Sequence, residues 1–334
     1  MRAPRFVPAW WLPGRHAQTV WGQVSRSRRL VRYERETIAA SDGDDLLVDH
    51  VAGPAGSPRL LLLHGLEGSS YSVYIQHLAL RARARGWRVS ALNLRSCARD
   101  PEATSTWIPN RRPRLYHSGE TGDPDLLIRT LAAREPATPL VAIGVSVGGN
   151  ILLKWLGENP DQRALHAAAT LSVPYDLAAA SRHMETRIGR YYLRWFLPSL
   201  REKVLHVAER FPEIRARIDM EATHRAVDFH PFDHAATAPL HGFDGADDYY
   251  ERCSSLHFVD RIRTPTFCLS ARDDPFLPEY VLDRLRDRVS DSVRLEVTPD
   301  GGHVGWVSGN HPGQVRYWAE ENVLDWIGAQ LETA

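Results

Sequence analysis

The fold is decided by the stretch Leu140-Val141-Ala142-Ile143-Gly144-Val145-Ser146-Val147-Gly148-Gly149-Asn150. Its first half is apolar and partly β-branched, which indicates a buried strand, and the apolar-rich residues 151–156 after it indicate a helix. Between them, Gly144-x-Ser146-x-Gly148 has the pattern of a nucleophile elbow, a strained strand-to-helix turn that presents a serine hydroxyl. So short a pattern also arises by chance, and its interpretation therefore depends on partners elsewhere in the chain.

Strands and helices alternate on both sides of this stretch. Apolar runs predict strands, and apolar residues at helical spacing predict helices between them. The elements expected in order are strand 60–63, helix 73–85, strand 87–93, helix 123–134 with Asp123 as its N-cap, strand 164–173, strand 265–270, helix 279–289, strand 293–297 and helix 314–331. This order is typical of an α/β fold with a mostly parallel sheet flanked by helices. Residues 30–38 and 45–51 predict an antiparallel hairpin at its start.

The remaining segments predict three further parts. Residues 1–28 are expected to form an irregular N-terminal arm that packs on the body. Residues 29–173 and 262–334 form the core, and residues 174–261, rich in Arg, His and aromatic side chains, predict a mostly helical cap insertion over the sheet. The long loop from residue 94 to 121 exceeds what a connection needs and is expected to line a site.

Composition limits the classes of partner. The 334 residues hold 41 Lys and Arg against 41 Asp and Glu, so no overall field favours nucleic acid. No apolar run is long enough to span a membrane, and the proline-broken N-terminus is not a signal peptide. Three cysteines without metal or redox spacing favour a reduced, cytoplasmic setting, and a monomer is favoured. Trp10 and Trp11 could contact a lipid surface peripherally, although packing on the body is the favoured interpretation.

A serine nucleophile needs a base and a group that orients the base, and both candidates follow Ser146 in the order Ser, Asp, His. His303 lies between glycines after the last predicted strand. Asp273 and Asp274 follow an earlier strand and compete for the orienting role. Asp274 is favoured because Pro278 follows it at the usual spacing of four residues.

Acyl transfer also needs backbone N–H groups that stabilise a developing oxyanion. The amide of Val147, directly after the serine, is one candidate. The amide of Leu66 is the other, because His64-Gly65-Leu66 follows an early strand and turns tightly.

Several motifs together resemble the YheT-like branch of the α/β-hydrolases, a group that also includes animal α/β-hydrolase-domain lipases. The matching stretches are His16-Ala17-Gln18-Thr19, His64-Gly65-Leu66-Glu67-Gly68-Ser69-Ser70, Tyr116-His117-Ser118-Gly119, residues 144–150, Thr237-Ala238-Pro239-Leu240-His241-Gly242-Phe243, Asp273-Asp274-Pro275-Phe276 and Gly301-Gly302-His303-Val304-Gly305. The resemblance implies a serine hydrolase of carboxylic esters, acting on an acyl ester or lipid, with Ser146, Asp274 and His303 as its triad. One departure is Arg95-Ser96-Cys97, where relatives tend to have Arg-Gly-Cys.

Other residues of the chain give weaker signals. His224, His230, His234 and His241 lack metal-ligand spacing, so we expect no metal; no dinucleotide fingerprint or P-loop lysine is present, so we expect no cofactor. The arginines at 26, 28, 29, 111 and 112 are interpreted as solvated faces in preference to a basic rim for anionic substrates.

Two alternative functions are kept. An acyltransferase would use the same acyl-enzyme, and a non-catalytic binding protein could share the fold, since fold alone does not ensure activity. Acyl chain length and head group are not encoded in any motif, because packing in the cap sets the pocket.

Overall fold

The computed structural model describes residues 5–27 and 30–332. Within them, one sheet of eight strands has the order β1-β2-β4-β3-β5-β6-β7-β8. The strands are β1 Glu34–Ala39, β2 Asp45–Val51, β3 Arg59–Leu63, β4 Arg88–Asn93, β5 Leu140–Val145, β6 Leu165–Leu171, β7 Thr266–Ala271 and β8 Val293–Thr298. Neighbours from β4 to β8 pair in parallel, and β1 and β2 add antiparallel pairs at one edge. The predicted mostly parallel α/β fold is confirmed.

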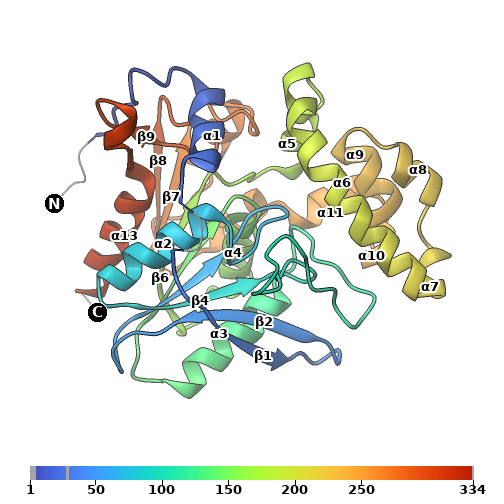
Figure 1. Ribbon diagram of the computed structural model, residues 1–334, viewed down its shortest axis with the longest axis horizontal. Coiled ribbons are helices and arrows are strands. Elements are labelled where there is room, and N and C mark those ends of the chain that lie inside the picture. The colour runs from blue at the N-terminus through green and yellow to red at the C-terminus, as the bar shows by residue number, and fades with distance from the viewer. Residues whose placement is uncertain (1–4, 28–29, 333–334) are drawn as a thin grey trace.

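Helices cover both faces of this sheet (Figure 1). Successive side chains of a strand point to opposite faces, and β3 divides its leucines accordingly. Leu60 and Leu62 pack with α2 (Val73–Ala84) and α13 (Trp318–Leu331), whereas Leu61 and Leu63 pack with helices of the opposite face. Those helices are α3 (Gly122–Arg134), α4 (Val147–Glu158) and α12 (Tyr280–Arg286). Burial on both faces explains the uninterrupted apolar run.

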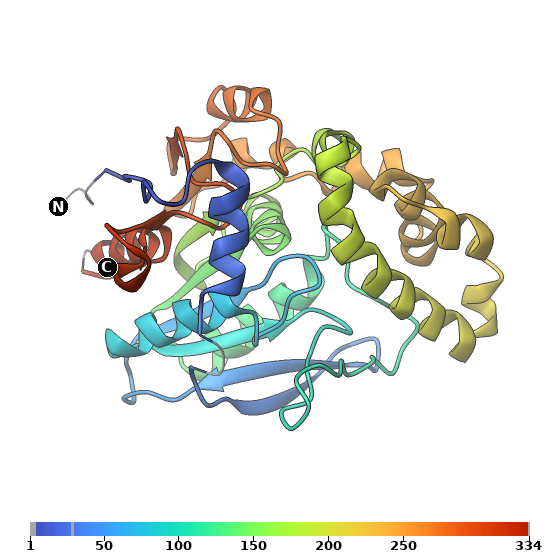
Figure 2. The ribbon, with the colours of Figure 1, turned by 45° about the horizontal axis from the view of Figure 1, so that its top comes forward.

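Between β6 and β7 the chain forms a group of helices beside the sheet (yellow to orange in Figures 1 and 2). They are α5 Leu177–Met184, α6 Arg187–Arg210, α7 Pro212–Arg215, α8 Met220–Arg225, α9 Phe229–Phe232, the π-helical turn Asp233–Thr237, α10 Ala238–His241, α11 Ala246–Cys253 and short 3₁₀ turns at Ser255–His257 and Val259–Arg261. Many of their apolar side chains form a hydrophobic core of their own, separate from the cores on the two faces of the sheet. We refer to residues 174–261 as the helical insertion.

The N-terminal arm is not irregular as expected: it contains α1, Arg15–Val24. The apolar residues Ala17, Val20, Trp21 and Val24 do have helical spacing, and this signal was overlooked. The buried residues of the helix are instead Gln18, Thr19 and Gly22. Trp11 packs edge-on against Trp21 of this helix, whereas Trp10 is exposed. A short ribbon of β9 (Val307–Ser308) and β10 (Arg316–Tyr317) lies next to the arm, and a 3₁₀ turn at Pro312–Gln314 lies between its two strands.

The interpretation of Arg26 as a solvated face is wrong. Its guanidinium is buried, with Nη2 2.8 Å from Oε1 of Glu320, and it stacks 4.0 Å above the ring of Tyr317. Glu320 lies almost three hundred residues along the chain, so nothing local to Arg26 revealed this pairing. Arg28 and Arg29 lie outside the described residues.

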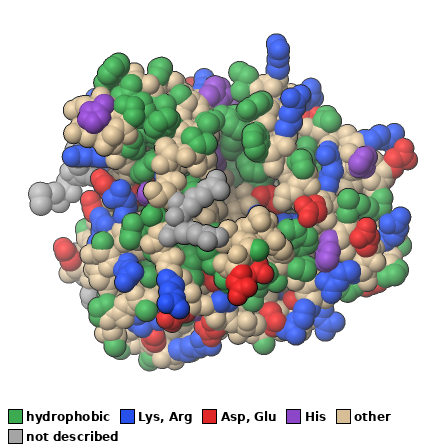
Figure 3. Space-filling view, in the orientation of Figure 1, with side chains coloured by type: hydrophobic (Ala, Val, Ile, Leu, Met, Phe, Trp, Pro, Cys, Tyr) green, Lys and Arg blue, Asp and Glu red, His purple; other side chains and the backbone are tan. Residues whose placement is uncertain are grey.

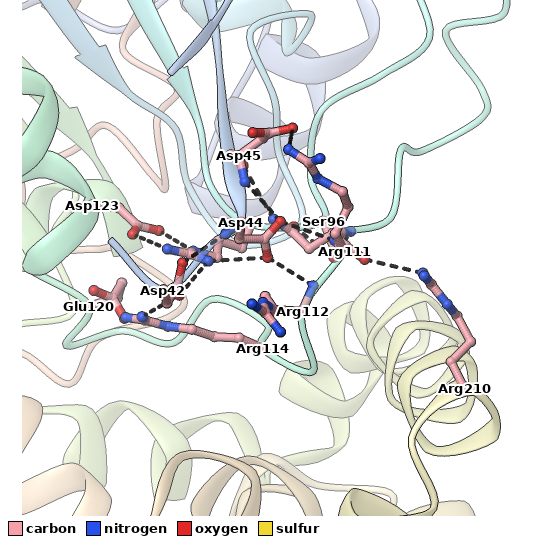
Figure 4. Close-up of polar contacts among 12 residues, drawn as sticks. Asp42, Asp44, Asp45, Ser96, Arg111, Arg112, Arg114, Glu120, Asp123 and Arg210 are labelled. Atoms are coloured by element: carbon pink, nitrogen blue, oxygen red, sulfur yellow. Dashed lines mark hydrogen bonds and ion pairs between the residues drawn. The ribbon is translucent and has the colours of Figure 1, made fainter. Parts of the chain in front are cut away.

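A buried charge cluster holds the long loop between β4 and α3 (Figure 4). Nη1 of Arg95 lies 2.8 Å from Oδ2 of Asp42, and Nη2 lies 2.7 Å from Oδ1 of Asp123. Asp44 accepts hydrogen bonds from the amides of Arg111 and Arg112. The expected N-cap role of Asp123 is therefore wrong, because its carboxylate pairs with Arg95 while Thr121 occupies the cap position.

Candidate active site

Ser146 lies at the tight turn between β5 and α4, with φ 53° and ψ −121°. A residue other than glycine rarely adopts a positive φ, so the surrounding packing must hold the backbone of Ser146 in this conformation. A Cβ on Gly144 would lie 2.5 Å from the carbonyl oxygen of Gly148, and one on Gly148 would lie 2.5 Å from that of His64. Both glycines are therefore required for strand and helix to meet behind the serine.

His303 connects Ser146 to Asp274. Its Nε2 lies 3.1 Å from Oγ of Ser146, and its Nδ1 lies 2.9 Å from Oδ2 of Asp274. The carboxylate cannot donate when ionised, so Nδ1 carries the proton and Nε2 accepts from the serine. The ring of Phe276 packs against the imidazole in a tilted arrangement, 4.2 Å between centroids, and the amide of Phe276 donates to Asp274. The structure thus brings together all three side chains expected from the sequence.

Asp273, the other candidate, does not reach the imidazole. Its Oδ1 accepts a hydrogen bond from the amide of Gly302 at 2.9 Å. Burial raises the pKa of this carboxyl group, and nearby Asp300 and Asp274 add to the rise. Asp273 therefore holds the backbone of the loop that carries His303.

The arm supplies contacts to the same loop that sequence reasoning missed. Oγ1 of Thr19 accepts a hydrogen bond from the amide of His303 at 2.9 Å. Gln18 accepts from the amide of Val307 at 2.7 Å and donates to its carbonyl oxygen. Ser172, after β6, accepts from the amide of Val304. The only available signal was the motif His16-Ala17-Gln18-Thr19, whose role the sequence left open.

The amides of Leu66 and Val147 border the cavity in front of Ser146. Neither donates a hydrogen bond to any group of residues 5–27 and 30–332. A Cβ on Gly65 would lie 3.1 Å from that of Ser146, so this loop passes close to the serine. Two free N–H groups near one hydroxyl can stabilise negative charge that develops there.

Glu67, next to Leu66, is anchored by a buried network from the helical insertion. Nζ of Lys203, on α6, lies 2.8 Å from Oε1 of Glu67, and Ser199 donates to the other carboxylate oxygen. Tyr116 accepts from the amide of Glu67 and donates to its carboxylate. Glu67 has φ 53°, so these contacts hold a strained residue beside the Leu66 amide.

His64 joins the same loop to the end of β4. Its Nδ1 lies 2.8 Å from the carbonyl oxygen of Gly65, and its Nε2 accepts from the amide of Leu94. These partners require the neutral imidazole with its proton on Nδ1. Burial lowers the pKa of His64 to about 4.

A cavity of about 520 Å³ opens in front of Ser146 and His303. Its walls are mainly apolar, and the helical insertion and the loop after β7 contribute much of this lining, including Leu177, Met184, Phe196, Phe229, Phe232 and Phe276. Such a volume and lining suit a ligand with a long apolar part and one reacting polar group.

The described residues contain no group of three or more His, Cys, Asp and Glu side chains arranged to hold a metal ion. Of the histidines first considered as ligands, His241 is half-buried, and its ring lies 4.6 Å from that of His117. His230 pairs with Asp247 at the surface.

A model of the alpha/beta hydrolase fold family matches residues 58–309. The chain belongs to the α/β-hydrolase family. This α/β-hydrolase is 32% identical over 332 residues to YheT of Escherichia coli (strain K12), which covers 98% of this chain and 94% of YheT. It is 30% identical over 324 residues to phospholipase ABHD3 of Mus musculus, which covers 93% of this chain and 75% of that protein. It therefore falls in the YheT-like branch.

Among solved structures, this hydrolase is similar to the esterase Pf2001 of Pyrococcus furiosus. The TM-score is 0.55 at 15% identity, over 100% of this chain and 97% of the other. At that identity the likeness concerns the fold. No helix among the residues that the structure describes is both long and apolar enough to cross a membrane.

Proposed function

We propose that this chain is a serine hydrolase of carboxylic esters, with Ser146 as nucleophile, His303 as general base and Asp274 as the group that orients the imidazole. The observation that carries the proposal is the continuous hydrogen-bond chain from Asp274 through His303 to Ser146, which ends at an apolar cavity. Nucleophile, base and orienting group in this geometry are the requirement for acyl transfer through serine.

The reaction proceeds in two halves. Oγ of Ser146 attacks the ester carbonyl as its proton passes to Nε2 of His303, and the imidazolium then gives that proton to the departing alcohol. Water, deprotonated by His303, attacks the resulting acyl-enzyme; the bond to Oγ of Ser146 then breaks, the imidazolium returns the proton to Oγ, and the acid is released. Asp274 stabilises the imidazolium in both halves without taking its proton.

The amides of Leu66 and Val147 serve as the oxyanion hole. Each is free to donate to the carbonyl oxygen when it becomes negative in the tetrahedral intermediate. One such donor contributes about 2.7–4 kcal/mol to transition-state stabilisation in comparable enzymes.

The acyl group is the part of the substrate that the cavity accommodates. Residues 174–261 act as a cap, because their apolar side chains form much of the cavity wall beside Ser146. Relatives named phospholipase ABHD3 and, in Saccharomyces cerevisiae, monoacylglycerol lipase support a fatty-acyl ester as the substrate class.

We also propose a cytoplasmic location. Cys97, Cys253 and Cys268 are free and buried, which suits a reducing compartment.

The direct test is labelling with a fluorophosphonate, followed by mass spectrometry of the modified peptide. We expect one adduct on Ser146 and none in Ser146→Ala. A folded chain that gives no adduct would overturn the proposal. Hydrolysis of p-nitrophenyl esters of increasing acyl length then locates the preferred chain, and an added alcohol acceptor reveals acyl transfer as an ester product.

A further inference from the structure

Five large apolar side chains are exposed around the entrance of the cavity. They are Val20 and Val24 on α1 and Ile188, Tyr191 and Trp195 on α6, with 44%, 69%, 55%, 56% and 71% of their surface exposed. All except Ile188 also line the cavity. We call these five residues the entrance rim.

The two helices of the rim lie on the same side of the molecule (Figures 1 and 2). Nδ1 of His16, on α1, lies 3.0 Å from the hydroxyl of Tyr192, on α6. The two helices are thus held together while each keeps an apolar stripe open to solvent.

On each helix the exposed residues share one face. Val20 and Val24 are four residues apart, and Ile188, Tyr191 and Trp195 are three and four apart. The opposite face of α6 is already used, because Leu193 and Leu197 pack into the core of the helical insertion. The outer stripe is therefore additional apolar surface that the fold itself does not require.

The charged residues of α1 and of residues 187–201 are all basic, and the exposed Glu185 precedes Ile188 by three residues. Arg187 and Arg194 lie on α6 next to Ile188 and Trp195, are exposed, and have no carboxylate partner within residues 5–27 and 30–332. Neither α1 nor residues 187–201 contain an Asp or Glu; the nearest on the chain are Glu185 and Glu202. Figure 3 shows hydrophobic side chains next to Lys and Arg side chains over the region of α5 and α6.

We propose that the entrance rim docks on an anionic phospholipid surface, from which an acyl ester passes between α1 and α6 into the cavity. Exposed Trp, Tyr and aliphatic side chains flanked by arginine are the composition that binds the boundary between head groups and acyl chains. Unpaired arginines near such a surface are attracted by anionic lipids.

A lipid surface fits this face better than a second copy of the chain. Two copies joined through the rim would bring the unpaired arginines of both into one interface, where like charges repel. A protein on the rim would also close the entrance that the rim surrounds, whereas a lipid surface supplies the substrate there. The proposal extends the proposed function, on which its account of substrate entry rests.

The test uses the full chain carrying Ser146→Ala, so that no lipid is consumed. Sedimentation with extruded vesicles is compared for pure phosphatidylcholine and for the same lipid with about one fifth phosphatidylglycerol, an anionic content that attracts basic residues. We expect binding to the mixed vesicles that weakens with added salt. Arg187→Ser with Arg194→Ser should weaken it by about 25-fold, roughly fivefold for each arginine, with little effect on neutral vesicles.

Removing the apolar contacts should weaken binding to both kinds of vesicle. Ile188→Ser with Trp195→Ser is expected to cost at least about tenfold, because two large side chains no longer leave water. The control is Tyr280→Ser on α12, which removes a side chain of similar exposure (51%) outside the cavity. It should bind as the parent does.

Absence of vesicle binding at low salt, or binding that the rim variants do not weaken, would overturn the proposal. A dimer in size-exclusion chromatography that Ile188→Ser with Trp195→Ser converts to monomer would also overturn it, in favour of a second copy. Fluorophosphonate labelling of Ser146 is scored separately, so failure of the docking surface and failure of the hydrolase chemistry give different results.

Discussion

Lys203 and Glu67 form a buried ion pair, 2.8 Å from Nζ to Oε1, that ties helix α6 to the residue following Leu66. The helical insertion therefore has a second role besides lining the cavity: it holds the residue that follows Leu66. If α6 moves, the backbone beside the Leu66 amide loses its contacts to Lys203 and Ser199 and keeps those to Tyr116.

Lys203→Met should lower both stability and activity, because Glu67 would be left as a buried carboxylate without a cation. Breaking such a pair costs about 3–5 kcal/mol. Urea unfolding measures the first effect, and kcat for a p-nitrophenyl ester measures the second. Adding Glu67→Gln removes the stranded charge, so the double variant should regain part of the lost stability; a double variant no more stable than Lys203→Met would contradict this account.

Asp274→Asn and Asp273→Asn form a matched pair. Asp274 contacts the imidazole, so its replacement should reduce kcat by about 10⁴-fold, as loss of the orienting acid does in serine proteases. Within residues 5–27 and 30–332, Asp273 accepts one hydrogen bond, from the amide of Gly302, and an asparagine oxygen can take over that bond. The kcat of the Asp273→Asn variant should therefore fall by less than about tenfold. Equal losses in the two variants would show that the loop, rather than the contact with His303, limits the rate.

Thr19→Val should slow the reaction although Thr19 lies in the arm. The change keeps the shape of the side chain but leaves the buried amide of His303 without its acceptor, at a cost of about 1–3 kcal/mol. A small displacement of His303 should reduce kcat by roughly ten- to a hundredfold with little change in KM. Thr19→Ser retains the hydroxyl and serves as the control, which should keep nearly full activity.

Ser96 stands where the resemblance led us to expect a glycine, and its backbone conformation allows a test of stability. It has φ 60°, the conformation that favours glycine, and its hydroxyl bonds with the side chain and amide of Asn110. Ser96→Ala and Ser96→Gly both lose these bonds, but only glycine relieves the backbone. The glycine variant should be more stable than the alanine variant by about 1 kcal/mol in urea unfolding. The reverse order would rule out strain at this position.

His64 should make stability depend on pH. Its pKa is about 4 in the folded chain, whereas a histidine exposed to water in an unfolded chain has a pKa of 6.5. Between these values the unfolded state binds more protons, so the free energy of unfolding is fully retained above pH 6.5 and falls by about 3 kcal/mol towards pH 4.

The comparison for this prediction is His64→Gln, which cannot titrate. Its free energy of unfolding, measured from pH 7 to 4.5, should decline less steeply than that of the parent by up to one proton, about 1.4 kcal/mol per pH unit. If the free energy of unfolding declined equally in the two proteins, the pKa of His64 would be the same in the folded and the unfolded chain, and the prediction would be wrong.

Local patterns predicted the sheet because the strands are buried on both faces, as in Leu60–Leu63, and such burial produces continuous apolar runs. The elbow at Ser146 and the order of Asp274 and His303 were predictable for a similar reason, since each follows a strand of a parallel sheet. The contacts that hold these residues in place could not be predicted from the sequence. Thr19 and His303, or Arg26 and Glu320, are polar partners far apart in the chain, and their residue types carry no information about which partner each will meet.

The contact between Thr19 and His303 has a consequence for where this enzyme can be cut. The stretch matched by the family model, residues 58–309, contains Ser146, Asp274 and His303 but not Thr19, Gln18 or helix α13. A chain trimmed to those limits would keep every residue proposed to take part in chemistry while exposing the back of the histidine loop to water. For this chain, a unit to be exchanged between proteins or fused to another domain should therefore begin ahead of α1 and include the final helix.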